Sequence, residues 1–173
     1  MKRAWWGFTI VELLVVITVI GILASIVIVS YSGSQDKARQ SKIQNDLSQL
    51  SDAIRVGRTQ QDKTLYDITG NTSTAWPCTQ KASGTDLSTL PKTDSCWTTY
   101  VATLSAISTA SGVNVNGLID PWGRPYFIDE NENESGSGSC TKDVIGVYQR
   151  PFVFNSYSPD NSQQIPNSLT ACL

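Results

Sequence analysis

A mainly apolar run of 22 residues near the start of the chain, residues 8–29, constrains the fold more than any other feature of the sequence. Glu12 is its only charged residue. As an α-helix the run would extend roughly 33 Å, because each residue adds about 1.5 Å, and this length is close to the hydrocarbon thickness of a bilayer. We therefore predict a helix that can span a membrane.

Beyond Ser34 the pattern becomes amphipathic. Apolar residues spaced four, three and four apart make one stripe, and polar residues fill the opposite face. The stripe consists of Ile43, Leu47, Leu50 and Ile54. No proline lies between Phe8 and Arg58, and Gly57 is placed as a helix stop. The sequence therefore predicts one long helix whose second half is half-buried.

The composition narrows the class of protein. The 173 residues are 40% hydrophobic and 16% charged, which suits one compact domain with one accessory element. The net charge is −2 and the pI is near 5.0, so the chain does not have the excess of basic residues that is typical of a dedicated nucleic-acid-binding protein. Histidine is absent, which excludes Ser-His-Asp, Cys-His and HExxH sites. We therefore predict no enzymatic activity and no dedicated nucleic-acid site.

The chain has four cysteines, Cys78, Cys96, Cys140 and Cys172, with no C-x-x-C spacing. An even set of this kind suits disulfides better than zinc or redox catalysis, and it indicates an oxidising compartment outside the cytoplasm for the C-terminal part. Four cysteines allow three pairings. We favour Cys78 with Cys96 and Cys140 with Cys172, because each pair closes one surface segment.

The remainder of the chain predicts a small head with a helix and a sheet. Apolar residues at helical spacing predict a short amphipathic helix, with an irregular loop as the alternative. They are Trp97, Tyr100, Val101, Leu104 and Ile107. Runs rich in β-forming residues at 125–128, 144–148 and 152–154 predict an antiparallel sheet. The acidic, glycine-rich residues 129–139 predict an exposed loop.

The sequence G-F-T-I-V-E-L-L-V-V-I at residues 7–17 closely resembles the prepilin-type processing and assembly motif shared by type IV pilins and type II secretion pseudopilins. The resemblance implies that a membrane-bound prepilin peptidase cuts between Gly7 and Phe8 and methylates the new amine of Phe8. It also implies that Glu12 pairs with the N-terminal amine of a neighbouring subunit. A carboxylate kept in such an apolar helix usually has a partner or a function.

The same resemblance implies an α+β fold of the type IV pilin lollipop kind, with a long N-terminal helix whose C-terminal half packs on a small antiparallel sheet. We expect a cleaved leader at 1–7, a transmembrane and polymerisation helix at 8–29, and a globular head at 30–173. The expected partners are further copies of the chain or minor pilins, the peptidase and an inner-membrane assembly platform. The subunit would cross the cytoplasmic membrane once with its head outside, and would enter an extracellular filament afterwards.

A second resemblance lies in the sequence D-P-W-G-R-P-Y at residues 120–126, which is similar to an element of major pseudopilins and related pilins. Asp120, Pro121 and Gly123 suit a type I turn, with Trp122 capping the core. We interpret this element as structural. In those pseudopilins a later acidic loop holds calcium, and residues 156–161 resemble only its beginning. The acidic residues 129–134 are the alternative calcium candidate, although they lack EF-hand spacing. We expect no cofactor and keep calcium as the alternative.

The sequence is compatible with three functions. We predict a structural subunit of a type IV pilus-like filament. The first alternative is a major pseudopilin of a type II secretion system, and the second is an adhesin or binding protein anchored in the membrane by a single helix. An ordinary secretory signal, with a cut after residues 30–32, is disfavoured because the apolar run exceeds the roughly 7–15 residues of such signals.

Overall fold

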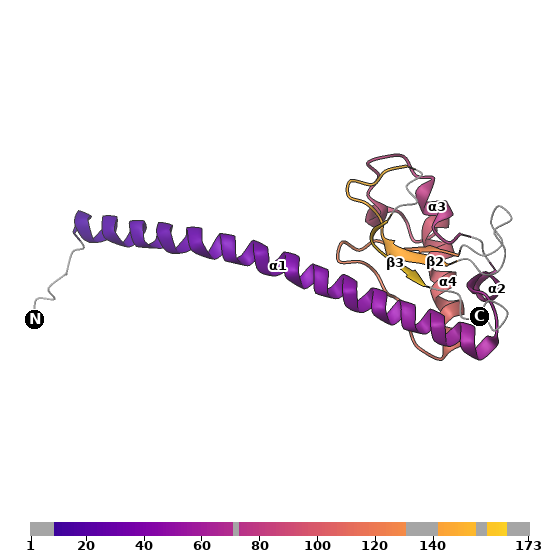
Figure 1. The fold of residues 1–173 in the computed structure, drawn as a ribbon. Coiled ribbons are helices and arrows are strands. Elements are labelled where there is room, and N and C mark those ends of the chain that lie inside the picture. The colour runs from indigo at the N-terminus through magenta and orange to yellow at the C-terminus, as the bar shows by residue number, and fades with distance from the viewer. Residues whose placement is uncertain (1–8, 71–72, 131–141, 155–158, 166–173) are drawn as a thin grey trace, which may run out of the picture. The chain divides into compact units, whose positions relative to one another are not determined.

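The computed structural model describes residues 9–70, 73–130, 142–154 and 159–165, except the side chains of residues 26–32. The chain divides into two compact units, one ending at Ser41 and one beginning at Lys42. The long helix α1, Ile10–Gln61, supplies residues to both (Figure 1).

In the first unit α1 is an exposed helix with apolar side chains. The exposed fractions of these side chains run from 78% at Ile10 to 46% at Val16. Within the described side chains, no helix carries an apolar stretch long enough to cross a membrane. The predicted span at 8–29 includes Phe8 and the side chains of residues 26–29, which lie outside the described part.

The second unit buries the predicted stripe of α1. Ile43, Leu47, Leu50 and Ile54 are at most 3% exposed and belong to one core cluster with the sheet. Gly57 does not stop the helix, which continues to Gln61. A Cβ at Gly57 would lie 3.4 Å from Cβ of Ala110, so this glycine allows α1 and the neighbouring helix to approach closely.

That neighbouring helix is α4, Ser95–Ser111, which the apolar spacing predicted. Asp94 caps its first turn, since the carboxylate accepts a hydrogen bond from the backbone N–H of Cys96 at 2.8 Å. Gly112, with φ of 71°, ends it in the left-handed conformation. Four of the five predicted apolar positions are buried, whereas Val101 is 56% exposed and faces away from the core.

The sheet has three antiparallel strands in the order β1-β2-β3. They are β1, Tyr126–Asp129, β2, Asp143–Val147, and β3, Asp160–Ile165. Tyr126 lies opposite Val147, and Ile128 opposite Ile145. Short helical segments complete the head, at Leu65–Thr69 (α2), Trp76–Thr79 (α3) and Leu87–Thr89 (η1). The predicted α+β fold is therefore confirmed.

The predicted third strand at 152–154 is wrong. Phe152 is buried in a second core cluster beside Tyr148 and Phe127, which explains its apolar character without any strand pairing. The third strand is instead the polar edge strand β3, in which only Ile165 is fully buried. Its other side chains are exposed or half-exposed, so no apolar alternation marks it in the sequence.

Candidate functional site

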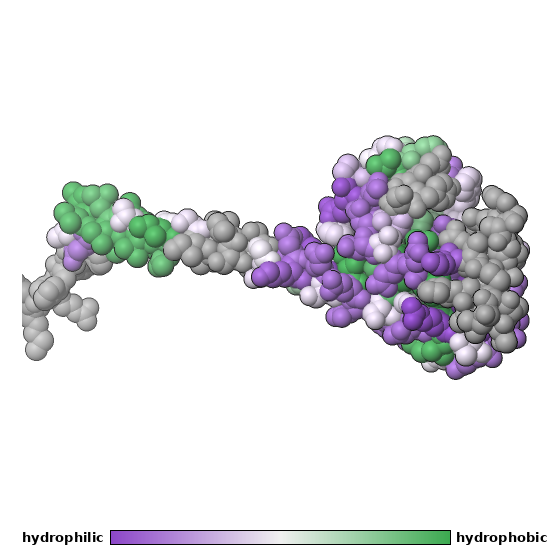
Figure 2. Space-filling view, in the orientation of Figure 1, coloured by the Kyte–Doolittle hydropathy of each residue, from purple (hydrophilic) through white to green (hydrophobic). Residues whose placement is uncertain are grey.

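The candidate assembly site is the exposed apolar part of α1. Figure 2 shows its hydrophobic side chains gathered on the first turns of the helix. The polar groups among them are satisfied locally, because the hydroxyls of Thr18 and Ser25 donate to the carbonyls of Val15 and Ile22 at 2.8 and 2.7 Å. The helix therefore offers apolar surface around its axis and little unmet hydrogen-bonding capacity.

Glu12 is the exception in this surface, and the structure gives it a local partner. Its carboxylate accepts hydrogen bonds from the backbone N–H and the hydroxyl of Thr9, at 2.9 and 2.8 Å. In return, the Thr9 hydroxyl accepts from the N–H of Glu12 at 3.2 Å. This reciprocal arrangement is a capping box, which satisfies free N–H groups at the start of a helix.

Thr9 was missed as a functional residue at the sequence level, although the spacing T-x-x-E is the usual signature of a capping box. The cap fixes the direction in which the carboxylate of Glu12 leaves the helix. Gly7 and Phe8, the predicted processing site, lie outside the described residues.

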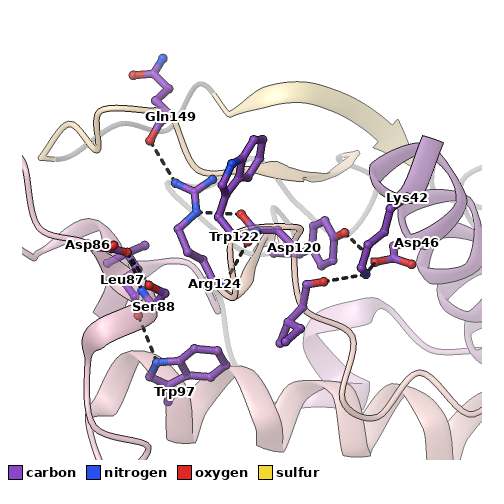
Figure 3. A network of polar contacts seen from close by, with 12 residues as sticks. Lys42, Asp46, Asp86, Leu87, Ser88, Trp97, Asp120, Trp122, Arg124 and Gln149 are labelled. Carbon is purple, nitrogen blue, oxygen red and sulfur yellow. Dashed lines mark hydrogen bonds and ion pairs between the residues drawn. The ribbon is translucent and has the colours of Figure 1, made fainter. Parts of the chain in front are cut away.

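The second feature is the turn at residues 120–123, shown in Figure 3. The N–H of Gly123 donates to the carbonyl of Asp120 at 3.0 Å, and Gly123 has φ of 79°. The carboxylate of Asp120 accepts from the N–H groups of Trp122 and Arg124 at 2.9 and 2.8 Å. The turn thus forms around Asp120, which is 2% exposed.

Arg124 completes this turn, a role that no pattern in the sequence indicated. Its Nε donates to Asp120 Oδ2 at 2.7 Å, and its Nη1 donates to the carbonyl of Gln149 at 3.3 Å (Figure 3). The arginine is only 4% exposed, so this is a buried ion pair that joins the turn to the chain after β2. Trp122 is half-buried against the core, as expected for a capping side chain.

A polar network connects α1 to the segment before the sheet. The Tyr126 hydroxyl donates to the Asp46 carboxylate at 2.7 Å, and Lys42 pairs with the same carboxylate. Lys42 also donates to the carbonyl of Ile119 at 2.8 Å (Figure 3). Burial, followed by the bond to Asp46, raises the pKa of Tyr126, so this hydroxyl stays protonated and remains a donor.

Cys78 and Cys96 form a disulfide, the pairing favoured for the first two cysteines. The bond joins α3 to the first turn of α4 across a separation of 18 residues. Cys140 and Cys172 lie outside the described residues, and so their predicted pairing stays a prediction.

The predicted exposed loop at 129–139 is wrong at its start. Asp129 ends β1 and is 8% exposed, and Glu130 is completely buried. The Glu130 carboxylate accepts hydrogen bonds from the N–H of Thr74 at 2.7 Å and from its hydroxyl. Burial raises the pKa of Glu130 to about 7, against the lowering effect of these two donors.

The calcium candidates divide between described and undescribed residues. Residues 131–134 and 156–158 lie outside the described part, whereas Asp160 and Asn161 belong to β3. Among the described residues, no three acidic, cysteine or histidine side chains gather where they could hold a metal ion. Glu130 is held by Thr74, so the structure gives it a part in packing rather than in a surface loop.

Comparison with known proteins gives a consistent set of relatives. A type II secretion system core protein G from Aeromonas hydrophila is 30% identical over 126 residues, which are 72% of this chain and 73% of the relative. Proteins of the same name from Klebsiella michiganensis and Vibrio cholerae serotype O1 are 44% and 36% identical over 53 and 67 residues. Those matches cover 31% and 39% of this chain, and 37% and 44% of the relatives. No family model and no solved structure matches the chain.

Proposed function

Because the chain belongs to the family of type II secretion system core protein G, the major pseudopilins, we propose that it is a structural subunit that polymerises through α1 into a secretion filament. The observation that carries the proposal is the match to the Aeromonas hydrophila relative, which extends over 72% of this chain and so beyond the N-terminal helix into the head. The role is structural and not catalytic.

The exposed side chains of α1 support polymerisation as the means of assembly. A row of large apolar side chains, each 46–78% exposed between Ile10 and Leu23, is unfavourable in water and becomes stable when lipid or other copies of the helix cover it. Before assembly we place this helix in the cytoplasmic membrane with the head outside. After assembly we place it in the interior of the filament.

Glu12 is the residue to which we assign the control of assembly. A carboxylate in apolar surroundings is costly unless it is hydrogen-bonded and paired with a cation. The capping box with Thr9 supplies hydrogen bonds but no positive charge. Cleavage after Gly7 by a prepilin peptidase would create an amine on Phe8, which methylation keeps basic. The amine of a neighbouring subunit would then neutralise Glu12 and set the axial position of each subunit.

The relatives favour a secretion filament over a surface pilus, because their names place them in type II secretion systems. An anchored adhesin is the remaining alternative. It would use α1 only as an anchor and would need no carboxylate within the helix. Glu12 therefore separates polymerisation from simple anchoring.

The test is a Glu12→Ala variant expressed with a prepilin peptidase and a type II assembly platform. We expect the variant to be processed and inserted but to yield no sedimentable filament, since the neighbouring amine has lost its partner. Asp36→Ala is the matched control, because Asp36 is an exposed acid on the same helix, outside the apolar run, and should leave filaments intact. Normal filaments from Glu12→Ala would refute the proposal.

Intact mass and N-terminal fragmentation test the processing step separately. Protein recovered from such cells should begin at an N-methylated Phe8. A chain that begins at Gly33, after an ordinary signal-peptide cut, would contradict processing after Gly7.

A further inference from the structure

The head carries a depression of about 480 Å³, and no residue of α1 lines it. Trp122, Arg124 and Arg150 line it together with the start of β3. A smaller hollow of about 280 Å³ adjoins it. The same three residues line this hollow, and Asp86 lines it as well. Volumes of this size admit one or two side chains and not a helix or a strand.

Arg150 is the exposed cation of this depression. Its guanidinium lies 4.4 Å from the centre of the Trp122 ring, and within the described part of the chain it forms no ion pair. An arginine stacked on an aromatic ring uses its flat face for the contact. The N–H groups along its edge stay available, and their planar fork matches a carboxylate.

Arg124 adds a second positive charge to the lining of the depression. Its guanidinium lies 5.2 Å from the same ring centre, and Asp120 and Gln149 engage its Nε and Nη1. Its Nη2 is buried and has no hydrogen-bond partner among the described residues, so a ligand in the depression does not reach it. Arg124 therefore contributes positive charge beneath the Trp122 ring, and Arg150 contributes the accessible N–H groups.

The acidic residues at the edge limit the charge of the ligand. Asp86 borders the smaller hollow and accepts hydrogen bonds from the N–H and hydroxyl of Ser88 at 3.0 and 2.7 Å. Asp160 lies at the edge of the larger depression. Asp86 interacts electrostatically with both arginines and, with Asp160, offsets part of their charge, which disfavours a polyanion such as a nucleic acid or a phospholipid surface. A single carboxylate can still pair with Arg150.

We propose that this depression binds one acidic side chain of a second copy of the chain, and so forms a contact between heads in the filament. The inference rests on the proposed polymerisation. Two exposed carboxylates of the head, Asp52 in α1 and Asp62 directly after it, make no ion pair within the described residues and can supply the charge. The contact joins a stacked arginine to a free carboxylate and complements the apolar contacts of α1.

Charge reversal tests the contact in the full-length chain, expressed with the peptidase and the assembly platform. Arg150→Asp should lower the yield of sedimentable filament about tenfold, the loss expected when a contact worth about 1.4 kcal/mol disappears. Arg150→Lys should give an intermediate yield, because lysine keeps the charge but loses the flat stack and the bidentate fork. Arg55→Asp, at an exposed arginine outside the depression, controls for the change in net charge.

Cysteine pairing identifies the occupant. Copies carrying Arg150→Cys are expressed together with copies carrying Asp52→Cys or Asp62→Cys, and dimers are detected on a non-reducing gel. We expect a crosslinked dimer with one of the two aspartate positions, and none when either variant is expressed alone. Absence of a crosslink with both positions, or wild-type filament yield from Arg150→Asp, would overturn the inference.

The two proposals fail in different ways. If the wild-type chain forms no filament, the proposed function itself is wrong. If the wild type, Arg55→Asp and Arg150→Asp all form filaments equally, only the contact at the depression is wrong and polymerisation through α1 stands.

Discussion

Glu130 is a carboxyl group completely enclosed by the head, with Thr74 as its donor. Burial raises its pKa from 4.5 to about 7, so the folded protein binds a proton more tightly than the unfolded chain. Protons bound preferentially by the folded state stabilise it below pH 4.5, and this contribution is lost as the pH rises through 7. Glu130 therefore makes the head less stable at pH 8 than at pH 5.

A Glu130→Gln variant should remove this pH dependence. Glutamine keeps an acceptor oxygen for Thr74 but carries no charge. Between pH 5 and pH 8, Glu130 should lower the unfolding free energy of the wild type by on the order of 2–3 kcal/mol. The variant should not show this loss. Urea unfolding at both pH values measures it, with Asp52→Asn as an exposed control. Parallel pH profiles of the variant and the wild type would contradict the prediction.

Local contacts were predictable from the sequence, and contacts over long separations were not. The turn at Asp120 could be predicted because its hydrogen bonds join residues at most four apart. The burial of Glu130 could not, because Thr74 lies 56 residues away in the sequence. An acidic residue beside other acids and amides has the composition of a surface loop, and only the tertiary fold gives it an interior partner.

At the level of elements, the sheet shows a similar division. The apolar strands β1 and β2 and the helix α4 follow from their patterns. The edge strand β3 does not, because an edge strand exposed to water needs few apolar residues. Phe152 gave a misleading signal, since it is apolar for packing against Tyr148 and not for strand pairing.

Gly146 determines how closely β3 approaches β2. A Cβ at this position would lie 2.8 Å from Cβ of Pro159 and 3.0 Å from the carbonyl oxygen of Asp160, at the irregular step in the pairing of the two strands. No carbon atom fits at these distances, so the chain before β3 would have to move. The glycine therefore permits a close approach of two backbones.

Gly146→Ala should loosen β3 and lower the unfolding free energy of the head by about 1–3 kcal/mol, the usual cost of overpacking. Hydrogen exchange at the amides of β3 should speed up more than exchange in α4. Gly33→Ala is the control, because Gly33 is helical with open space around it and alanine there should stabilise by about 1 kcal/mol. Unchanged hydrogen exchange in β3 would contradict the prediction, because it would mean that Pro159 moves aside without lowering the stability of the strand.

At the scale of the whole molecule, the end of α1 is joined to the sheet by a buried ion pair. Nη2 of Arg58 lies 2.6 Å from Oδ2 of Asp143, and both side chains are fully buried. The partners are far apart in sequence, since one lies near the end of α1 and the other begins β2. A pair enclosed in this way is expensive to break, because the remaining charge cannot reach water.

Arg58→Ala should lower the unfolding free energy of the head by about 3–5 kcal/mol. The double variant Arg58→Met with Asp143→Leu should recover most of that loss, because it leaves no buried charge behind. Arg39→Ala removes the exposed pair with Asp36 and should cost less than about 1 kcal/mol. Denaturant unfolding of the three variants makes the comparison, and a double variant no more stable than Arg58→Ala would refute the explanation.

The exposed residues of α1 have a geometric consequence for a polymer. Apart from Glu12, Thr18 and Gly21, every position from Ile10 to Leu23 carries a large exposed apolar side chain, so the apolar surface extends around the helix axis and has no single narrow face. In the proposed filament, neighbouring helices could therefore rotate against each other at small cost, and this layer would not determine the twist. In the filament that we propose, Glu12 would set the height of each subunit, and the polar contacts of the head would set its angle.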